Sequence, residues 1–347
     1  MSLRAEIDRY VDQELVTAKP NGPLTIYTYS TKCVMAGAWD YYTRLSRGLI
    51  LDEAGNIVAL PLEKFFNVNE REETLLHNLP KEIPELSVKH DGSLVIVFFD
   101  PYSDKWVCVT KGAWDNPQVR YATKFVHTRL RKEAMNPEWT YSFELVAPWN
   151  RIVLLYQNED MILIGVRDRT TMWDASYSEV AAVATDIGVR SVEFWTDRTV
   201  ETLDMANSEV RNAEGFVARY SNGKRIKFKY SQYLLMHAVV SNLSEKTVWE
   251  AVSTKSEIDF TAIPDEYYKW YLERKATLLS KKAELHRKVT ASWMATPRFA
   301  SRGQFAAHWK TMEPWVTACL FRRLDGKPYD EILWKQLRPS GLGEHFL

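Results

Sequence analysis

The sequence predicts an antiparallel α+β domain followed by a separate, all-helical C-terminal domain. Short segments with strand composition, separated by turn sequences, recur as far as residue 229. After about Val239 this pattern ends, and the longest helical pattern of the chain covers residues 265–293. Pro264 precedes that pattern, and acidic residues occupy its first turn, as is typical of a helix start. We therefore divide the chain into residues 1–239 and 240–347.

The first domain is expected to begin with an amphipathic helix over residues 5–16, because Ile7, Tyr10, Val11 and Leu15 form an apolar stripe. Turn sequences at residues 53–56 and 221–223 each predict a hairpin between the segments that flank them. The predicted strands are residues 24–29, 48–52, 57–60, 94–99, 106–110, 140–145, 162–167, 215–220 and 224–229. Helices are predicted over residues 116–134 and 176–187.

The C-terminal domain is expected to contain two shorter helices, residues 304–310 and 329–337, after the long one. Residues 265–347 carry 15 Lys and Arg against 9 Asp and Glu, although the whole chain is neutral. This basic excess fits contact with a polyanion, but a solvated helix face often has the same composition.

The composition narrows the class of protein. A hydrophobic content of 46%, with 13 Trp, 17 Tyr and 14 Phe, excludes a disordered chain. Three widely spaced cysteines form neither a disulfide framework nor a zinc-binding pattern. The N-terminus does not resemble a signal peptide, and no apolar run approaches the ~20 residues that span a bilayer. We expect a soluble, monomeric, cytoplasmic protein without membrane contacts.

Five charged residues lie within or beside segments of strand composition, where burial is expected. They are Lys89, Glu144, Glu214, Lys227 and Lys229. Lys227 and Lys229 alternate with apolar residues, so both should lie on one face of their strand. Because a buried charge needs a partner or a ligand, the set predicts a site for an anion with a metal, such as a triphosphate with Mg²⁺.

Each of these residues has an ordinary structural explanation when taken alone. A lysine before Asp-Gly is commonly solvated in a surface turn, a Lys-x-Lys pair commonly faces solvent on an edge strand, and a single buried glutamate is commonly half of an ion pair. Gly92, three residues after Lys89, is expected to let the phosphates of a ligand approach the backbone. Only the combination favours a functional site.

The five charged residues lie in four short stretches of sequence. Taken in order, these stretches resemble the motifs of covalent nucleotidyltransferases, the superfamily of ATP-dependent ligases and mRNA capping enzymes. They are Lys89-His90-Asp91-Gly92, Phe143-Glu144, Glu214-Gly215-Phe216-Val217 and Ile226-Lys227-Phe228-Lys229. Three further stretches, residues 46–50, 61–70 and 143–153, resemble the phage RNA ligase 1 type. The resemblance covers residues 24–237 and implies an antiparallel-sheet nucleotidyltransferase (ATP-grasp-like ligase) domain. The last hundred residues are similar only in being helical.

The resemblance also implies roles for single residues. Lys89 would be the nucleophile that takes AMP. The implied contacts are Tyr29 and Lys111 at the nucleotide, Arg47 and Lys64 at the outer phosphates of ATP, Lys227 and Lys229 at the α-phosphate, and Glu144 and Glu214 at Mg²⁺ or Mn²⁺. Asp259 would be a further acidic metal contact. His90 fills a variable place in its motif, and its side chain should point away from that of Lys89.

The implied function is that of an ATP-dependent RNA ligase. It would join 5′-phosphate and 3′-hydroxyl RNA ends through a lysyl–AMP and an adenylated RNA, in RNA repair such as tRNA repair, and in the host cytoplasm if a phage encodes it. A capping guanylyltransferase or a DNA ligase shares the core motifs. In both, a strand-rich OB-fold usually follows the last motif, whereas residues 240–347 of this chain have a helical pattern. A fungal-type tRNA ligase adenylyltransferase and a catalytically inert RNA-binding relative would carry similar motifs as well. The five intact charged residues argue against the inert relative.

Overall fold

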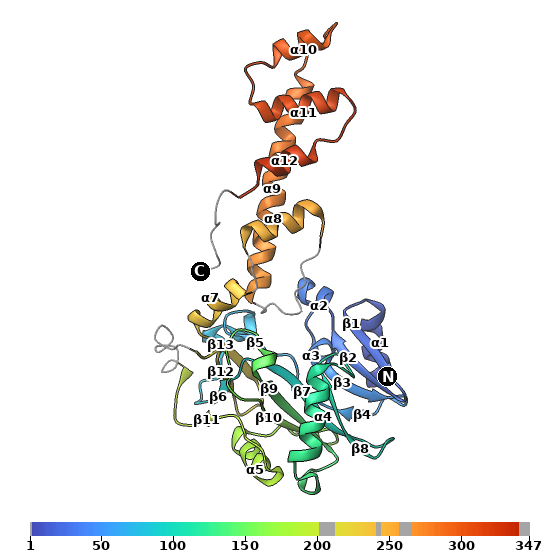
Figure 1. The fold of residues 1–347 in the computed structure, drawn as a ribbon, viewed down its shortest axis with the longest axis vertical. Coiled ribbons are helices and arrows are strands. Elements are labelled where there is room, and N and C mark those ends of the chain that lie inside the picture. Colours follow the sequence, from blue (N-terminus) through green and yellow to red (C-terminus); the bar gives the residue numbers. More distant parts are fainter. Residues whose placement is uncertain (1, 201–211, 241–243, 257–265, 340–347) are drawn as a thin grey trace. The chain divides into compact units, whose positions relative to one another are not determined.

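The computed structural model describes residues 2–200, 212–240, 244–256 and 266–339. These residues form two compact units, Met1–His237 and Ala238–Leu347. The strands that the structure describes lie in the first unit, and the described elements of the second unit are helices (Figure 1). The structure is therefore mixed α and β with antiparallel sheets followed by C-terminal helices, as expected.

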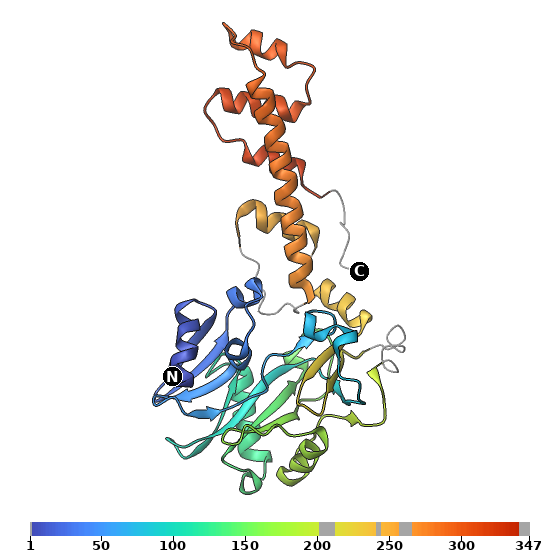
Figure 2. The same cartoon turned by 180° about the vertical axis from the view of Figure 1, so that it is seen from behind.

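The first unit contains three sheets, which Figure 2 shows from behind. The first sheet has the order β1 (Val16–Asn21), β2 (Leu24–Tyr29), β3 (Arg47–Asp52), β4 (Ile57–Ala59). The second has the order β10 (Asp160–Asp168), β9 (Trp139–Val146), β7 (Ser93–Asp100), β8 (Lys105–Thr110). The third has the order β11 (Phe194–Trp195), β6 (Glu85–Lys89), β12 (Gly215–Arg219), β13 (Arg225–Lys229), β5 (Phe66–Asn67). The pair β13–β5 is parallel, and the other named pairs are antiparallel.

Strand β7 shows how the layers pack. Its residues Val95 and Val97 belong to one apolar cluster, and Ile96 and Phe98 belong to another. Since successive side chains of a strand point to opposite faces, β7 is covered on both sides. One side is the core beneath α4 (Pro117–Arg129) and α5 (Tyr177–Ile187), and the other is shared with the first sheet. Burial on both faces explains why residues 94–99 of β7 are all apolar.

The remaining helices of the first unit are short or peripheral. They are α1 (Leu3–Asp12), α2 (Thr31–Ala36), α3 (Tyr41–Leu45) and α7 (Ser231–Val240), with the 3₁₀ turns Glu72–Thr74, Leu76–Asn78, Lys132–Ala134 and Pro148–Asn150. All three cysteines are buried free thiols, in agreement with their spacing.

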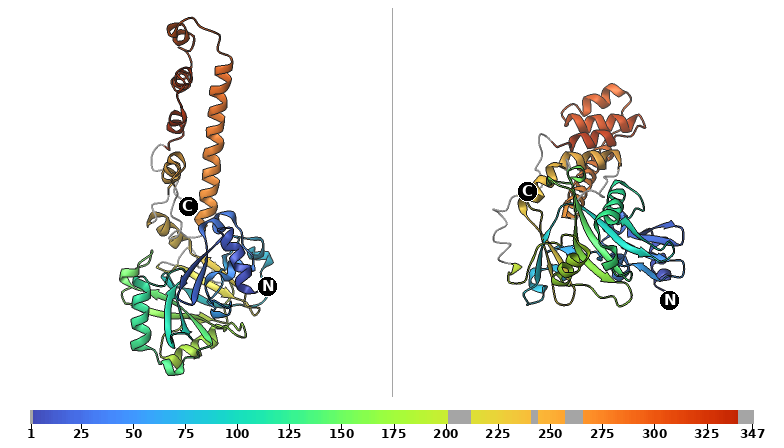
Figure 3. Two further views of the ribbon diagram at one scale, coloured as in Figure 1. Left: turned by 90° about the vertical axis from the view of Figure 1, so that its right-hand side faces the viewer. Right: turned by 60° about the horizontal axis from the view of Figure 1, so that its bottom comes forward.

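The second unit is organised around the long helix α9 (Glu266–Met294). Figure 3 shows the shorter helices α8 (Glu245–Thr254), α10 (Arg302–His308), α11 (Pro314–Leu324) and α12 (Asp330–Gln336) following one another beside it. Buried Val289 of α9 packs with Phe305, Val316 and Leu333 from three of these helices. None of the helices in the described part of the chain combines the length and apolar composition that crossing a bilayer requires.

The predicted strands are all present, each end within two residues of the observed bounds. The helix predicted over residues 5–16 was too long, because it ends at Asp12 and a strand begins at Val16. That strand, β1, has Val16 as its only buried residue and carries Pro20 at the edge of its sheet, so its composition gave no strand pattern. The predicted helix over residues 116–134 ends at Arg129, with a separate 3₁₀ turn behind it. Pro264 and Asp265, the predicted start of the long helix, lie outside the described residues, and α8 and α11 were not predicted.

Candidate active site

Lys89 is the last residue of β6 and shares one carboxylate with Lys229. Its Nζ lies 2.6 Å from Oε1 of Glu214, and the Lys89 and Glu214 side chains are 21% and 4% exposed. Nζ of Lys229, at the end of β13, lies 3.5 Å from the same oxygen. The strand register produces this arrangement, because Gly215 of β12 pairs with Lys89 on one side and with Lys229 on the other. We call Lys89, Glu214 and Lys229 the lysine–glutamate cluster.

Gly215 allows the cluster to form. A Cβ atom at this position would lie 1.9 Å from the carbonyl oxygen of Phe228 on β13, a distance that no side chain tolerates. The glycine directly after Glu214 therefore lets β12 lie close to β13, and the glutamate is held between the two lysines.

Glu144 of β9 lies near enough to the cluster for the charges of Lys89 and Glu214 to act on its carboxyl group. Its Oε1 accepts a hydrogen bond of 3.1 Å from the backbone N–H of Gly92. Burial raises the pKa of Glu144 to about 7, and the charges of Lys89 and Glu214 act on it in opposite directions. A cation placed beside this carboxyl group would stabilise its ionised form.

Gly92 lies against the backbone of β9, and its expected approach to the phosphates of a ligand stays a prediction. A Cβ atom here would lie 2.3 Å from the carbonyl oxygen of Leu145, so the glycine is required for the chain to pass β9. The contact that demands a glycine is thus with the protein backbone, and it sets the position of the turn after Lys89.

Asp91 ties this turn to two other parts of the unit. Its buried carboxylate accepts hydrogen bonds from the backbone N–H groups of Val153 (2.8 Å) and Leu154 (2.7 Å). The hydroxyl of Tyr233 on α7 donates a third bond of 2.8 Å. Asp91 therefore fixes the chain two residues after Lys89.

Two of the predicted phosphate and nucleotide contacts, Lys64 and Lys111, lie at the ring of a third, Tyr29, at the end of β2. Nζ of Lys111 donates to the Tyr29 hydroxyl at 3.4 Å and lies 4.7 Å from the ring centroid. Nζ of buried Lys64 lies 5.9 Å from the same centroid, and 5.4 and 5.2 Å from those of Trp39 and Phe66. The lysines are thus held by aromatic faces, a favourable setting for a cation.

Arg47 and Lys227 meet at a different ring, that of Phe65. The guanidinium carbon of Arg47 and Nζ of Lys227 each lie 5.7 Å from the Phe65 centroid. Arg47 also donates to the carbonyl oxygen of Leu62 at 3.1 Å. Lys227 and Lys229 are partly exposed while Ile226 and Phe228 are buried, which confirms the predicted alternation on β13.

The structure thus brings the predicted residues of the site into three neighbouring groups. They are the lysine–glutamate cluster with Glu144, the pair Arg47 and Lys227 at Phe65, and the pair Lys64 and Lys111 at Tyr29. Asp259 lies outside the described residues.

His90 lies with its ring centroid 6.4 Å from that of Tyr156. Burial lowers the pKa of His90 to about 4, so its ring is neutral at pH 7.

Sequence reasoning gave no role to Asp91 or Asn150, nor to Trp39 and Phe66 beside Lys64. Asn150 donates to the carbonyl oxygen of Leu145 at 2.9 Å and accepts from the Ser93 hydroxyl at 3.1 Å, so it also supports the strands that carry the site. Both residues lie inside the stretches that carry the resemblance, which is the signal that could have identified them.

The side chains of the site can hold a metal ion only if a bound ligand or water supplies further oxygen atoms. Within the described ranges, no three His, Cys, Asp or Glu side chains converge as a complete metal site. Glu144 and Glu214 supply two carboxylates whose charges act on each other, so a divalent cation here would draw its other oxygens from phosphates or water.

Comparisons with known proteins identify the family of this chain. Residues 45–236 match the model of a family described as RNA ligase. An RNA ligase of Rhodothermus phage RM378 is 24% identical over 328 residues, covering 73% of each chain. A Thermovibrio ammonificans protein with the provisional name RNA ligase is 26% identical over 175 residues, which span 48% of this chain but only 44% of that protein.

Among solved structures, a provisionally named ATP-dependent DNA ligase from Aquifex aeolicus has a similar fold. Its TM-score is 0.51 at 14% identity, over 94% of this chain and 88% of that one. The family model spans more than half of the chain and includes the lysine–glutamate cluster, Glu144, Arg47, Lys64, Lys111 and Lys227. This protein therefore belongs to the RNA ligase family.

Proposed function

We propose that the protein is an ATP-dependent RNA ligase that joins a 5′-phosphate to a 3′-hydroxyl end of RNA. The observation that carries the proposal is the lysine–glutamate cluster, which presents a partly exposed amine beside a buried carboxylate and a second cation. Its three residues come from the stretches that the RNA ligase family model covers. The Met1–His237 unit would act as the nucleotidyltransferase domain.

In the first step, Nζ of Lys89 attacks the α-phosphorus of ATP. A nitrogen–phosphorus bond forms, the bond from that phosphorus to the bridging oxygen breaks, and pyrophosphate leaves. The amine must lose a proton to attack, and Oε1 of Glu214, 2.6 Å away, is positioned to accept it. Lys229, which faces the same carboxylate, would then lie beside the negative charge that develops on the α-phosphate.

The other cations would contact the rest of the nucleotide. Lys227 would join Lys229 at the α-phosphate, and Arg47, at the same Phe65 ring, would act with Lys64 to hold the outer phosphates and orient the leaving pyrophosphate. Lys111 would contact the nucleotide beside Tyr29. Glu144 and Glu214 would hold Mg²⁺, which when bound supplies positive charge to the phosphate oxygens.

The second and third steps transfer the nucleotide and seal the strand. A 5′-phosphate oxygen of RNA attacks the phosphorus of lysyl–AMP, the nitrogen–phosphorus bond breaks, and Lys89 is released. A 3′-hydroxyl then attacks the RNA phosphorus, and AMP leaves. RNA repair, for example of a broken tRNA, is the process that uses such ends.

A capping guanylyltransferase or a DNA ligase is the second candidate, because both share the nucleotidyl step. The described part of the second unit supports the RNA ligase, since it consists of helices and not of the strands of an OB-fold. We further propose that this unit selects or holds the RNA, because residues 265–347 carry the basic excess of the chain.

Labelling with radioactive nucleotide tests the proposal. The wild type should become labelled by α-³²P-ATP and not by α-³²P-GTP, and Lys89→Ala should take no label yet still seal RNA that is already adenylated. Lys105→Ala, which removes an exposed lysine of β8, serves as the control. Labelling of the Lys89→Ala protein by ATP would show that the nucleophile is another residue, and labelling of the wild type by GTP alone would favour the capping reaction.

A further inference from the structure

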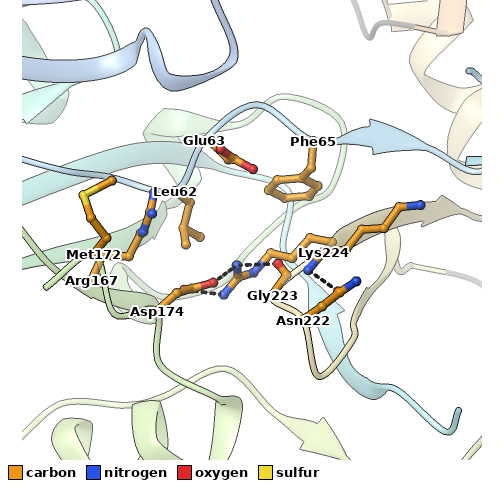
Figure 4. A pocket seen from close by; sticks show the side chains of 10 residues that line it. Leu62, Glu63, Phe65, Arg167, Met172, Asp174, Asn222, Gly223 and Lys224 are labelled. Carbon is orange, nitrogen blue, oxygen red and sulfur yellow. Dashed lines mark hydrogen bonds and ion pairs between the residues drawn. The ribbon is translucent and has the colours of Figure 1, made fainter. Parts of the chain in front are cut away.

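A cavity lies apart from the lysine–glutamate cluster (Figure 4). It has a volume of about 370 Å³, and its walls are formed by Leu62, Glu63, Phe65, Arg167, Met172, Asp174 and residues 222–225 of the β12–β13 turn. Its size is within the range of pockets that hold small ligands. Two of its residues also contact the proposed ATP site: Phe65, whose ring Arg47 and Lys227 approach, and Leu62, whose carbonyl oxygen accepts from Arg47.

Strand β13 connects this cavity to the cluster. Arg225 lines the cavity, Lys227 follows two residues later, and Lys229 reaches Glu214. The three basic side chains alternate with buried Ile226 and Phe228, so they share one face of the strand. Four residues of a strand span ~13 Å, which is the approximate separation of the cavity from the cluster along β13.

The two guanidinium groups of the cavity differ in the number of their partners. Arg225 donates from both terminal nitrogens to the carboxylate of Asp174, at 2.5 and 2.9 Å, while its buried Nε has no hydrogen-bond partner among the described residues. Arg167, labelled beside Met172 in Figure 4, donates to the carbonyl oxygen of Pro61 at 3.2 Å. Its Nε, like that of Arg225, is buried without a hydrogen-bond partner among the described residues. Since Arg167 makes fewer hydrogen bonds than Arg225, it has the greater donor capacity left for a ligand.

The rest of the lining includes flat or flexible apolar surface. Figure 4 shows Leu62 between Arg167 and the ring of Phe65, with Met172 beside Arg167. A nucleobase combines a flat apolar face with hydrogen-bond acceptors on its edge, and proteins bind unstacked bases against aromatic rings and guanidinium groups. A cavity with both kinds of group fits a nucleotide better than a purely apolar ligand.

We propose that this cavity binds one unstacked nucleotide of an RNA strand that runs along β13 toward Lys89. Phe65 is the shared wall, because it lines the cavity while Arg47 and Lys227 approach its ring at 5.7 Å. After pyrophosphate has left, an RNA strand whose phosphate is held by these two cations would have its neighbouring nucleotide beside the cavity. The identity of the strand as RNA rests on the proposed function.

Substitutions of Met172 test the proposal without removing a buried group. Met172 is 37% exposed and has a φ of 63°, a left-handed conformation that Asp and Asn adopt more readily than Met. Met172→Asp places a carboxylate in the cavity beside Arg167, where it competes for the guanidinium and repels phosphate. Met172→Asn has nearly the same shape without the charge and is the matched control.

The measurement is the affinity of the full-length protein for a fluorescent, 5′-phosphorylated single-stranded RNA, followed by anisotropy. Loss of one bound base weakens binding by about 5-fold to 150-fold, so Met172→Asp should bind at least about 5-fold more weakly than Met172→Asn. Arg167→Lys, which keeps the charge but loses the planar donor fork, should also weaken binding, and circular dichroism establishes that each variant is folded. Equal affinities of the two Met172 variants, with Arg167→Lys at the wild-type level, would overturn the proposal.

Two further measurements are needed. AMP titration distinguishes an RNA nucleotide from a free nucleotide in the cavity, and labelling by ATP distinguishes a failure of the cavity proposal from a failure of the ligase proposal. The affinity for AMP should be the same in the two Met172 variants. If Met172→Asp binds AMP more weakly but RNA as well as before, the cavity binds free nucleotide and the RNA assignment is refuted. Labelling by ATP should be the same in both variants, and a parallel loss would make the cavity part of the ATP site. If the wild type takes no label at all while RNA binding still responds to Met172→Asp, the ligase proposal fails and the cavity proposal stands.

Discussion

Replacing Asp91 by Asn should loosen the turn that follows Lys89. The Asp91 carboxylate is 2% exposed and accepts three hydrogen bonds, from Val153, Leu154 and Tyr233. Asn keeps the shape of the side chain, but it has one acceptor oxygen and no charge. Its oxygen can serve the two backbone N–H groups, and its amide can donate to the Tyr233 hydroxyl.

The magnitude follows from the loss of charge. A hydrogen bond to a charged group contributes about 1.5–3 kcal/mol and a neutral one about 0.5–1.5 kcal/mol, so converting the two backbone bonds costs about 2 kcal/mol in the free energy of unfolding. For a unit of this size, each kcal/mol lowers the melting temperature by about 2–4 °C, so the expected decrease is about 4–8 °C.

Scanning calorimetry of the full-length chain measures this decrease. Tyr233→Phe, which removes a single donor to Asp91, is the matched comparison and should lower the melting temperature less. Because the two residues share one bond, the double variant should be less destabilised than the sum of the single variants. A melting temperature of Asp91→Asn equal to that of the wild type, or strictly additive effects, would refute the assignment of Asp91 as the residue that fixes this turn.

Two further predictions concern Glu144 and the helical unit. Folding raises the pKa of Glu144 from 4.5 to about 7, so the native state binds more protons between these values and the Glu144 contribution to stability should fall as pH rises through this window. Urea unfolding in EDTA should show this decline in the wild type relative to Glu144→Gln, and parallel pH profiles would contradict it. In the helical unit, reversing the charges of the exposed α9 residues Lys281 and Arg287 should reduce the slope of log affinity for single-stranded RNA against log salt by ~0.7 per lost phosphate contact. A slope that matches that of Lys105→Glu would mean that these residues are merely solvated.

Much of the fold could be predicted because its elements are encoded locally. Strand β7 is marked by an apolar run, and β9 by aromatic and apolar residues that alternate with Thr140, Ser142 and Glu144. Lys227 and Lys229 were assigned to one face from their alternation alone. The period of a strand relates residues two apart, so this information is present in any short stretch. Strand β1 was missed for the converse reason, since an exposed edge strand with a proline lacks that pattern.

By itself the sequence determined the types of residue in the site and the family whose motifs they match. It did not determine that Lys89 and Lys229 share Glu214, because this depends on the register of β12 against β6 and β13. Nor did it assign Gly92 to its contact with Leu145, or place Arg167 and Phe65 in one cavity. Only the tertiary structure decides such relations, since the burial of all three sheets together sets which strands pair and in what register.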